Sequence, residues 1–175
     1  MRNVISIKVQ NVPGVLSHVA GLLASRAFNV DSLTVCATDD PKFSRMTVVL
    51  DVEPELVGQV ESQLRKLVTV VETTNLSNVP HVERELALIR VVATPRERLS
   101  ALELAEIFRA RVVDVAPNSL LFEISGRCSK LDAFIEALAP LQSVSVARSG
   151  SIASARGDYD LKRKGIAPKP EPRAD

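Results

Sequence analysis

The first apolar residues of the chain alternate with polar ones. Residues 4–9 place apolar side chains on one face of an extended segment and Ser6 and Lys8 on the other, which is the pattern of a half-buried strand. After a short loop, apolar residues recur at helical spacing between Val15 and Leu23. The pattern therefore predicts a strand, a loop and a helix.

Two further strands and a second helix complete this unit. The β-branched runs 32–38 and 45–52 are separated by an Asp- and Pro-containing connection typical of a hairpin. Pro54 suits the first turn of a helix whose apolar stripe extends to Leu67, and residues 69–76 supply a last strand. The order βαββαβ predicts a ferredoxin-like fold, in which two helices cover one face of a four-stranded antiparallel sheet.

The same order of elements recurs in the second half of the chain. The expected elements are a strand over 86–93, a helix over 99–108, strands over 112–115 and 120–124, a helix over 129–138 and a strand over 143–148. We expect Ser129 to cap the second of these helices, and Leu99, Leu102 and residues 104–108 to face the core. The fold class is therefore α+β, with two tandem ferredoxin-like domains.

Changes in the apolar pattern suggest the domain boundaries. We expect a first domain over residues 1–77, a linker over 78–85 where Pro80 interrupts the pattern, and a second domain over 86–157. Residues 158–175 lose the apolar pattern and become basic and Pro-rich, which predicts a mobile tail.

Composition and charge narrow the classes of function. Lys and Arg number 22 against 21 Asp and Glu, a net charge of +1, so no overall field attracts nucleic acid or a membrane surface. Cys36 and Cys128 fall in different repeats and form no CxxC pair or zinc-ligand spacing, which fits a reducing cytosol. A strand pattern begins at residue 4, with no signal-like or membrane-spanning apolar run before it. We therefore expect a cytoplasmic protein.

The loop Asn11-Val12-Pro13-Gly14-Val15-Leu16 occurs in the first repeat only. The start of a helix offers unpaired N–H groups that suit a carboxylate, and Gly14 allows a ligand to approach the backbone. The amide of Asn11 can donate and accept, so the carboxylate and ammonium of an α-amino acid match the loop, and Asn29 of a second chain could add another amide. The alternative is a tight turn in which Asn11 only caps the helix.

The other candidate residues have ordinary structural interpretations. His18 fits a boundary position on its helix, and His81 fits a solvated hinge. Glu103 and Glu106 fit a solvated helix face, and Cys36 fits a small packed residue. Phosphate-loop, metalloprotease and nucleophile-elbow motifs are absent from the sequence, so we expect neither catalytic residues nor a metal site.

Several segments, in this order and spacing, resemble one known family, the regulatory (small) subunits of acetolactate synthase, also called acetohydroxyacid synthase. The segments are residues 11–16, Asn29-Val30-Asp31-Ser32-Leu33-Thr34-Val35, Thr38-Asp39-Asp40-Pro41, Ser44-Arg45-Met46-Thr47, His81-Val82-Glu83-Arg84-Glu85, Ile107-Phe108-Arg109, Lys130-Leu131-Asp132-Ala133-Phe134 and Ala147-Arg148-Ser149-Gly150. The resemblance covers about residues 2–157 and implies that the first domain is an ACT domain.

The resemblance also implies a function without catalysis by this chain. In branched-chain amino acid biosynthesis (valine, leucine and isoleucine), members bind and activate a catalytic large subunit and confer allosteric feedback inhibition by valine. That partner carries thiamine diphosphate, Mg and FAD, and this chain carries no cofactor. Two ACT domains pair edge to edge as a homodimer, with the effector at their interface. By position, the effector-binding residues are Asn11, Gly14, Val15, Leu16, Asn29 and Val30.

The sequence departs from the family pattern in two places. Cys36-Ala37 replaces a small residue and a proline, which could alter the pocket, and the tail is longer and more basic than expected.

Three rival functions were weighed against this interpretation. An ACT-type amino-acid sensor with a different target shares the loop and remains the alternative. An RNA binder lacks its aromatic platform, because Trp is absent and Tyr159 lies outside both repeats, and a metallochaperone lacks its thiol pair.

Overall fold

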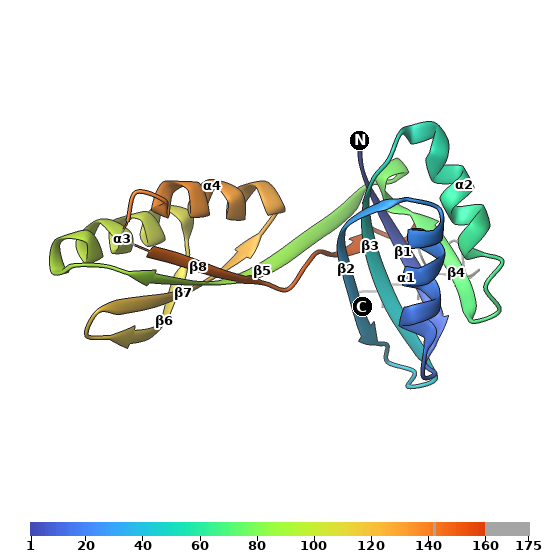
Figure 1. The fold of residues 1–175 in the computed structure, drawn as a ribbon, viewed down its shortest axis with the longest axis horizontal. Helices are drawn as coiled ribbons and strands as arrows, with labels where there is room; N and C mark the ends of the chain where they lie inside the picture. The colour runs from blue at the N-terminus through green and yellow to red at the C-terminus, as the bar shows by residue number, and fades with distance from the viewer. Residues whose placement is uncertain (142, 160–175) are drawn as a thin grey trace, which may run out of the picture.

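The computed structural model describes residues 1–141 and 143–159. Two α+β units, each built on an antiparallel sheet, follow one another along the chain, as the sequence predicted (Figure 1). The basic, Pro-rich tail expected from residue 158 lies outside the described residues from residue 160 onward.

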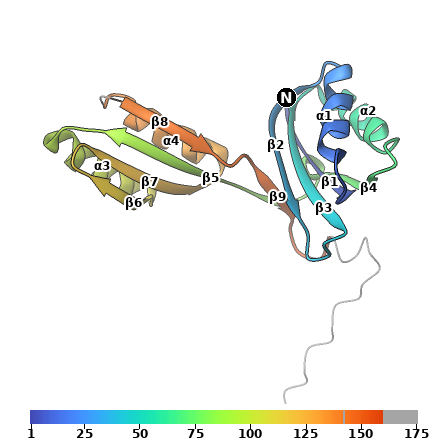
Figure 2. The same cartoon turned by 60° about the horizontal axis from the view of Figure 1, so that its bottom comes forward.

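The first unit follows the predicted βαββαβ order. Its elements are β1 (Arg2–Gln10), α1 (Val15–Ser25), β2 (Asn29–Ala37), β3 (Phe43–Asp51), α2 (Pro54–Leu64) and β4 (Val70–Asn75). The strands are ordered β2-β3-β1-β4, so that β2 and β4 are the edges. Both helices cover the same face of this sheet (Figures 1 and 2).

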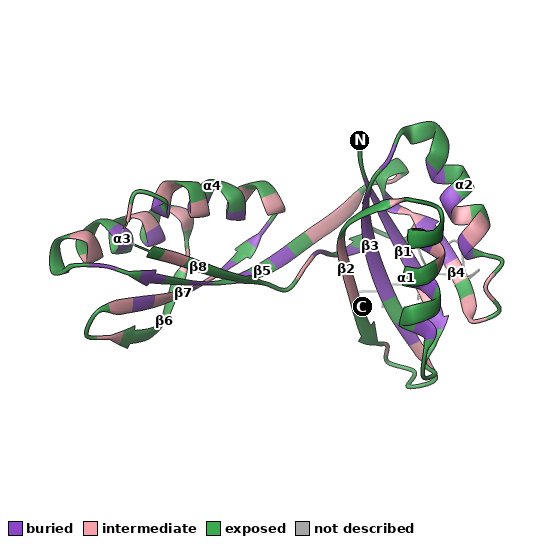
Figure 3. Cartoon of the chain, viewed as in Figure 1, coloured by how far each residue is buried: buried purple, intermediate pink, exposed green. Residues whose placement is uncertain are grey.

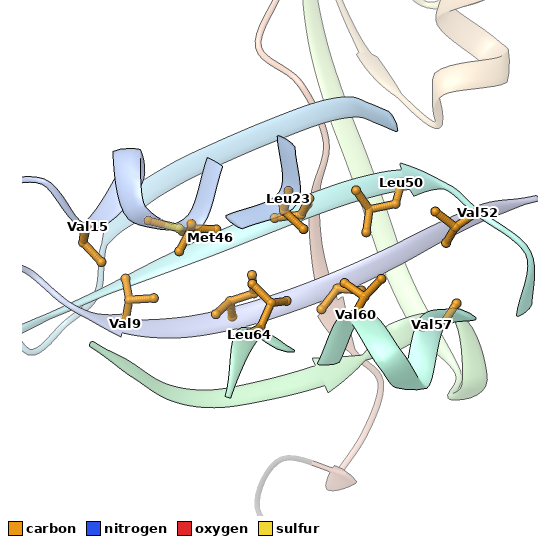
Figure 4. Close-up of a cluster of buried hydrophobic side chains, with 13 residues drawn as sticks. Val9, Val15, Leu23, Met46, Leu50, Val52, Val57, Val60 and Leu64 are labelled. Atoms are coloured by element: carbon orange, nitrogen blue, oxygen red, sulfur yellow. The ribbon is translucent and has the colours of Figure 1, made fainter. Parts of the chain in front are cut away.

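The core of the first unit lies between that face and the two helices (Figure 4). Ile5, Ile7 and Val9 of β1 are fully buried there, as predicted. The opposite face of β1, which includes Ser6, is buried as well, so the prediction of a half-buried strand was wrong. Val15, Val19 and Leu23 pack onto them from α1. Burying one such side chain stabilises the fold by about 1.5–3 kcal/mol relative to leaving it exposed, so this face fixes the register of the sheet.

The second unit repeats the order with one added strand. Its elements are β5 (His81–Val92), α3 (Pro95–Phe108), β6 (Arg111–Ala116), β7 (Ser119–Gly126), α4 (Cys128–Leu138), β8 (Ser143–Arg148) and β9 (Ile152–Ala155). The strands β6-β7-β5-β8 form the sheet, and β9 pairs with the first residues of β5. Phe134 of α4 contacts Phe108 and Phe122, with ring centroids 5.2 and 6.0 Å away.

Helix α3 turns a different face to its sheet from the one we expected. Leu99, Leu102 and Ile107 are exposed, with 65%, 41% and 73% of their surface accessible, whereas Ala101 and Ala105 are buried. Figure 3 shows that α3 has both exposed and buried stretches. The inward stripe passes through Ala101, Leu104, Ala105 and Phe108, and a helical period of 3.6 residues turns the three large residues away from it. The prediction that Leu99, Leu102 and Ile107 face the core was wrong.

The predicted cap of α4 was also wrong. The helix begins at Cys128, one residue before Ser129, and Arg127 takes the capping position without a side-chain bond to the first turn. The serine therefore lies inside the first turn, where a serine side chain no longer caps the helix.

The segment 78–85, which we expected to link the domains, consists largely of strand. A short 3₁₀ helix, η1 (Leu76–Asn78), precedes β5, whose residues His81–Arg84 pair with β9 before Glu85–Val92 join the second sheet. Strand β9 also packs on the first unit, where Ala153 joins Val4, Val49 and Leu76 in a small apolar cluster. The face of the first sheet opposite the helices is therefore partly covered, and Ser6 on that face is buried.

Candidate functional site

The loop between β1 and α1 is held by backbone hydrogen bonds of its first two residues. The amide of Asn11 donates to the carbonyl of Lys42 (2.8 Å), and the amide of Val12 donates to that of Gln10 (3.0 Å). Gly14 then takes the left-handed conformation, with φ of 84°, directly before the first helical residue. That conformation favours glycine over any residue with a side chain.

The space over Gly14 is open. A Cβ atom at this position would meet nothing within 4 Å, so the glycine serves the backbone conformation and not close packing. Helix α1 has no side-chain cap and no acidic residue in its first turn. The first-turn amides, including those of Leu16 and Ser17, therefore point toward an exposed position that also receives the positive end of the helix dipole.

Residues 13 and 14 do form a turn, but Asn11 does not cap α1, so the capping part of the alternative interpretation is wrong. Its Nδ2 atom donates to the carbonyl oxygen of Pro41 (3.0 Å), which ties the loop to the β2–β3 hairpin. Within the described residues its Oδ1 atom accepts no hydrogen bond, and the residue is exposed. This oxygen is available to a donor such as an ammonium group.

The two valines and the leucine of the predicted site differ in burial. Val15 is buried in the core of the first unit, so its side chain anchors the end of the loop to that core. Leu16 and Val30 are exposed, with 42% and 37% of their surface accessible. Only these two therefore offer apolar surface to a ligand.

Asn29 and Val30 lie far from the loop within one chain. Asn29 begins β2 and is paired with Asp51, whereas the loop adjoins the other end of the sheet, where Ala37 is paired with Ser44. The eight steps from Asn29 to Ala37 span about 26 Å at 3.3 Å per residue. One chain therefore does not bring the predicted effector-binding residues together.

A second copy of the chain has a route to completing the site. Strand β2 is an edge strand, and within the described residues its only backbone ladder is with β3. An antiparallel two-fold contact between two β2 edges would bring the Asn29 end of one chain beside the Ala37 end of the other. Val35, 39% exposed at this edge, would be covered by such a contact.

The remaining candidates do not assemble into a catalytic arrangement. His18, Glu103 and Glu106 are exposed on their helices, and His81 Nδ1 donates to the carbonyl oxygen of Val79 (2.9 Å). Cys36 is exposed, so the expectation of a packed residue was wrong. The residue lines an open groove of about 330 Å³ between β2, β3, β5 and β9.

Several ion pairs between distant segments were missed at the sequence level, and one of them joins the two units. The guanidinium of Arg2 binds the carboxylate of Glu83 with two hydrogen bonds, one of them 2.9 Å long, and this lowers the pKa of Glu83. Arg148 binds Asp132, which lowers the pKa of that carboxyl, and lies 3.8 Å from Glu85. Burial, followed by the bond to Asp132, raises the pKa of the Cys128 thiol. Long-range pairs such as these leave no signal in local sequence patterns.

Helices in the described ranges fall short of the length and apolar content that a membrane crossing needs.

Comparison with known proteins identifies the family. A family model described as the small subunit of acetolactate synthase matches residues 84–157, and one described as an AHAS small subunit-like ACT domain matches residues 5–72. The acetolactate synthase small subunit of Haemophilus influenzae is 43% identical over 162 residues, which cover 92% of this chain and 99% of that protein. The chain belongs to the acetolactate synthase small-subunit family. Its first unit is thus an ACT domain, and the family is that of a regulatory partner.

Other members of the acetolactate synthase small-subunit family agree in extent and fold. The Escherichia coli acetolactate synthase isozyme 3 small subunit is 40% identical over 163 residues, which cover 93% of this chain and all of that protein. The crystal structure of the small subunit from Thermotoga maritima is 37% identical, covers 90% of this chain and superposes with a TM-score of 0.83. The resemblance inferred from the sequence is confirmed.

Proposed function

We propose that this chain is a cytoplasmic regulatory subunit that activates the catalytic subunit of acetolactate synthase and makes it sensitive to valine. The catalytic subunit would contribute thiamine diphosphate and the chemistry of pyruvate condensation, and this chain would contribute the effector site. The proposal rests above all on one observation: in a small-subunit ACT domain, Gly14 opens an uncapped helix start toward exposed space.

Each chemical group of valine has a complementary group on the chain. Its carboxylate would accept hydrogen bonds from the amides of the first turn of α1. Its ammonium would donate to Asn11 Oδ1 of the same chain and to the side-chain oxygen of Asn29 of a partner chain. Its isopropyl group would contact the exposed surfaces of Leu16 and Val30.

The proposed site lies between two chains of a homodimer that pair along β2. Valine would bridge the two chains and favour one dimer arrangement. In that arrangement this chain would activate the catalytic subunit less. By thermodynamic linkage, the catalytic subunit alters valine affinity by the same factor, typically about 1–3 kcal/mol. One methylene in an apolar pocket is worth about 1–3 kcal/mol, so leucine and isoleucine should bind measurably as well.

The decisive experiment measures pyruvate condensation by the cognate catalytic subunit, with and without this chain, across a valine titration. Stimulation by the chain that valine then reverses is the expected result. An unchanged rate in both conditions would contradict the proposal and leave an ACT-type sensor with a different target.

A further inference from the structure

Ser151 lies in the segment that returns from the second unit to the first, and two side chains of β2 hold its backbone. Its amide donates to Ser32 Oγ (3.1 Å), and its carbonyl oxygen accepts from Thr34 Oγ1 (2.9 Å). Ser32 and Thr34 are two residues apart on one strand, so both hydroxyls point to the same face of the sheet. Ser151 is 2% exposed, so water does not compete freely for these two bonds.

Gly150 allows this close approach. Its φ is +79°, and a Cβ atom would lie 2.7 Å from Ser32 Oγ and 2.8 Å from Thr34 Cγ2. A side chain here would therefore be strained by the backbone and would also collide with both hydroxyl-bearing residues. We refer to Ser32, Thr34, Gly150 and Ser151 as the β2 clamp.

The β2 clamp is joined to the second unit within two residues. Leu86 of β5 and Ser149 exchange hydrogen bonds, since Ser149 N donates to the Leu86 carbonyl oxygen (2.9 Å) and Leu86 N donates to Ser149 Oγ (3.1 Å). One residue earlier, Arg148 binds Asp132 of α4. Only a very short length of chain therefore separates Ser151 from the contacts with β5 and α4, and Figure 2 shows the segment that runs from β8 to β9.

The same strand carries the proposed effector residues. Asn29 and Val30 precede Ser32 by three and two residues on β2, and the pairing register of β2 shifts between Val30 and Ser32. A bulge of this kind interrupts the ladder and bends the strand locally, so the regular β-ladder does not continue unbroken from the effector residues to Ser32. The β2 clamp lies directly beyond it.

We propose that the β2 clamp couples the effector end of β2 to the second unit, so that amino-acid binding at Asn29 and Val30 changes the docking of residues 149–155. This inference rests on the proposed function, because it takes valine as the ligand of β2. Coupling through a few packed contacts with two discrete arrangements is sufficient for such a device. The second unit thereby responds to occupation of the effector site without contacting the effector.

The test is amide hydrogen exchange of the full chain, with and without saturating valine, and with valine affinity measured by calorimetry. In the wild type, valine should change exchange of the peptide 149–155 by at least about fivefold, the low end of typical allosteric coupling. The double variant Ser32→Ala, Thr34→Val removes both hydroxyls while preserving shape. It should bind valine within about threefold of the wild type, yet lose the exchange response of residues 149–155.

A matched control loses hydroxyls elsewhere in the same domain. Ser62 donates to the Gly58 carbonyl oxygen on α2, and Thr73 Oγ1 accepts from Arg65 Nε near the opposite sheet edge. The double variant Ser62→Ala, Thr73→Val should keep both valine binding and the exchange response. Gly150→Ala provides a steric test and should raise exchange of residues 149–155 even without valine.

The outcomes separate this inference from the proposed function. An equal exchange response in the wild type and in Ser32→Ala, Thr34→Val would overturn the coupling while leaving the effector site intact. Valine binding to the wild type with no response at 149–155 would do the same. Loss of valine binding in that variant would assign the hydroxyls to the effector site instead, and failure of the wild type to bind valine would overturn both proposals.

Discussion

Gly14 and Asn29 lie at opposite ends of α1. Gly14 precedes the first residue of the helix, and Asn29 begins the strand that follows its last turn. The eleven helical residues between them span about 16 Å at 1.5 Å per residue. An α-amino acid is too short to contact both in one chain, so a site that uses both residues must take them from two chains.

Gly14→Asp should abolish valine inhibition while leaving activation of the catalytic subunit intact. The new carboxylate would occupy the position proposed for the carboxylate of the ligand, and the two negative charges would repel one another. Asp tolerates the left-handed backbone better than most residues, so the fold should persist. The measurement is the condensing rate against valine concentration.

Gly14→Asn is the matched control, because it has the same shape and similar backbone tolerance but no charge. It should weaken valine binding less than Gly14→Asp does. Equal effects of the two variants would point to a steric or backbone cause and would contradict carboxylate binding at the helix start. Joint loss of activation and inhibition would indicate damaged folding or subunit contact.

Hybrid dimers of Gly14→Asp and Asn29→Ala chains should regain one valine site per dimer. One of the two shared sites would then combine both substitutions, and the other would combine an intact loop with an intact Asn29. Each variant alone should bind little valine, so restoration in the hybrid requires a site shared between chains. Calorimetry on hybrids purified through two different tags measures this stoichiometry.

Hybrids that bind no valine would contradict the shared site. In that case the loop would have to bind valine with other residues of its own chain. Asn29, which lies at the far end of β2, would then not belong to the effector site.

The element order was predictable because each repeat packs an apolar face of its strands against an apolar stripe of most helices. Ile5, Ile7 and Val9 show the strand period directly, and Val15, Val19 and Leu23 show the helical one. The glycine loop was also predictable from the sequence, since Pro-Gly directly before a helical pattern is typical of a turn at a helix start. Local patterns of this kind can be recognised in a single sequence.

Features that depend on distant segments were not predictable. The exposed Ile107 lies beside Phe108 in an apolar stretch, and only the packing of α3 on its sheet decides which of them turns inward. Strand β9 is four residues long and pairs with a strand some 70 positions away, a range that local periodicity does not reach. The contacts of Ser151 with β2 are of the same long-range kind.

Val35→Glu should weaken the proposed homodimer. Val35 is 39% exposed on edge strand β2, and a two-fold contact along that edge would bury one new carboxylate from each chain. We expect the dimer dissociation constant to rise about 10- to 100-fold, which corresponds to about 1.4–2.8 kcal/mol. Val71→Glu is the control, because Val71 is 52% exposed on the other edge strand, β4. Sedimentation equilibrium measures both, and equal weakening by the two variants would contradict pairing along β2.

Glu83→Gln should destabilise the chain at neutral pH by about 1 kcal/mol, a modest value because Arg2 is 41% exposed and solvent screens the pair. Arg2 lowers the pKa of Glu83 in the folded chain below its unfolded value. The contribution of this carboxylate to stability is therefore fully present above the unfolded pKa of about 4.3 and is lost as the pH falls through the lower, folded pKa. Denaturant unfolding at several pH values should show the two proteins converging below about pH 4. A constant difference down to pH 3 would show that the carboxylate charge is not responsible.

Ile107→Ala and Ile124→Ala remove the same atoms from two positions of the second unit and should change its stability by very different amounts. Ile124 is 1% exposed in the core beneath α4, so its truncation should cost about 2–5 kcal/mol. Ile107 is 73% exposed on α3, and alanine is the better helix former, so its truncation should change stability by less than about 0.5 kcal/mol. Denaturant unfolding of the chain alone, followed by far-ultraviolet circular dichroism, compares the two. Comparable losses at both positions would mean that α3 turns its large residues toward the core after all, in the orientation that its apolar pattern first suggested.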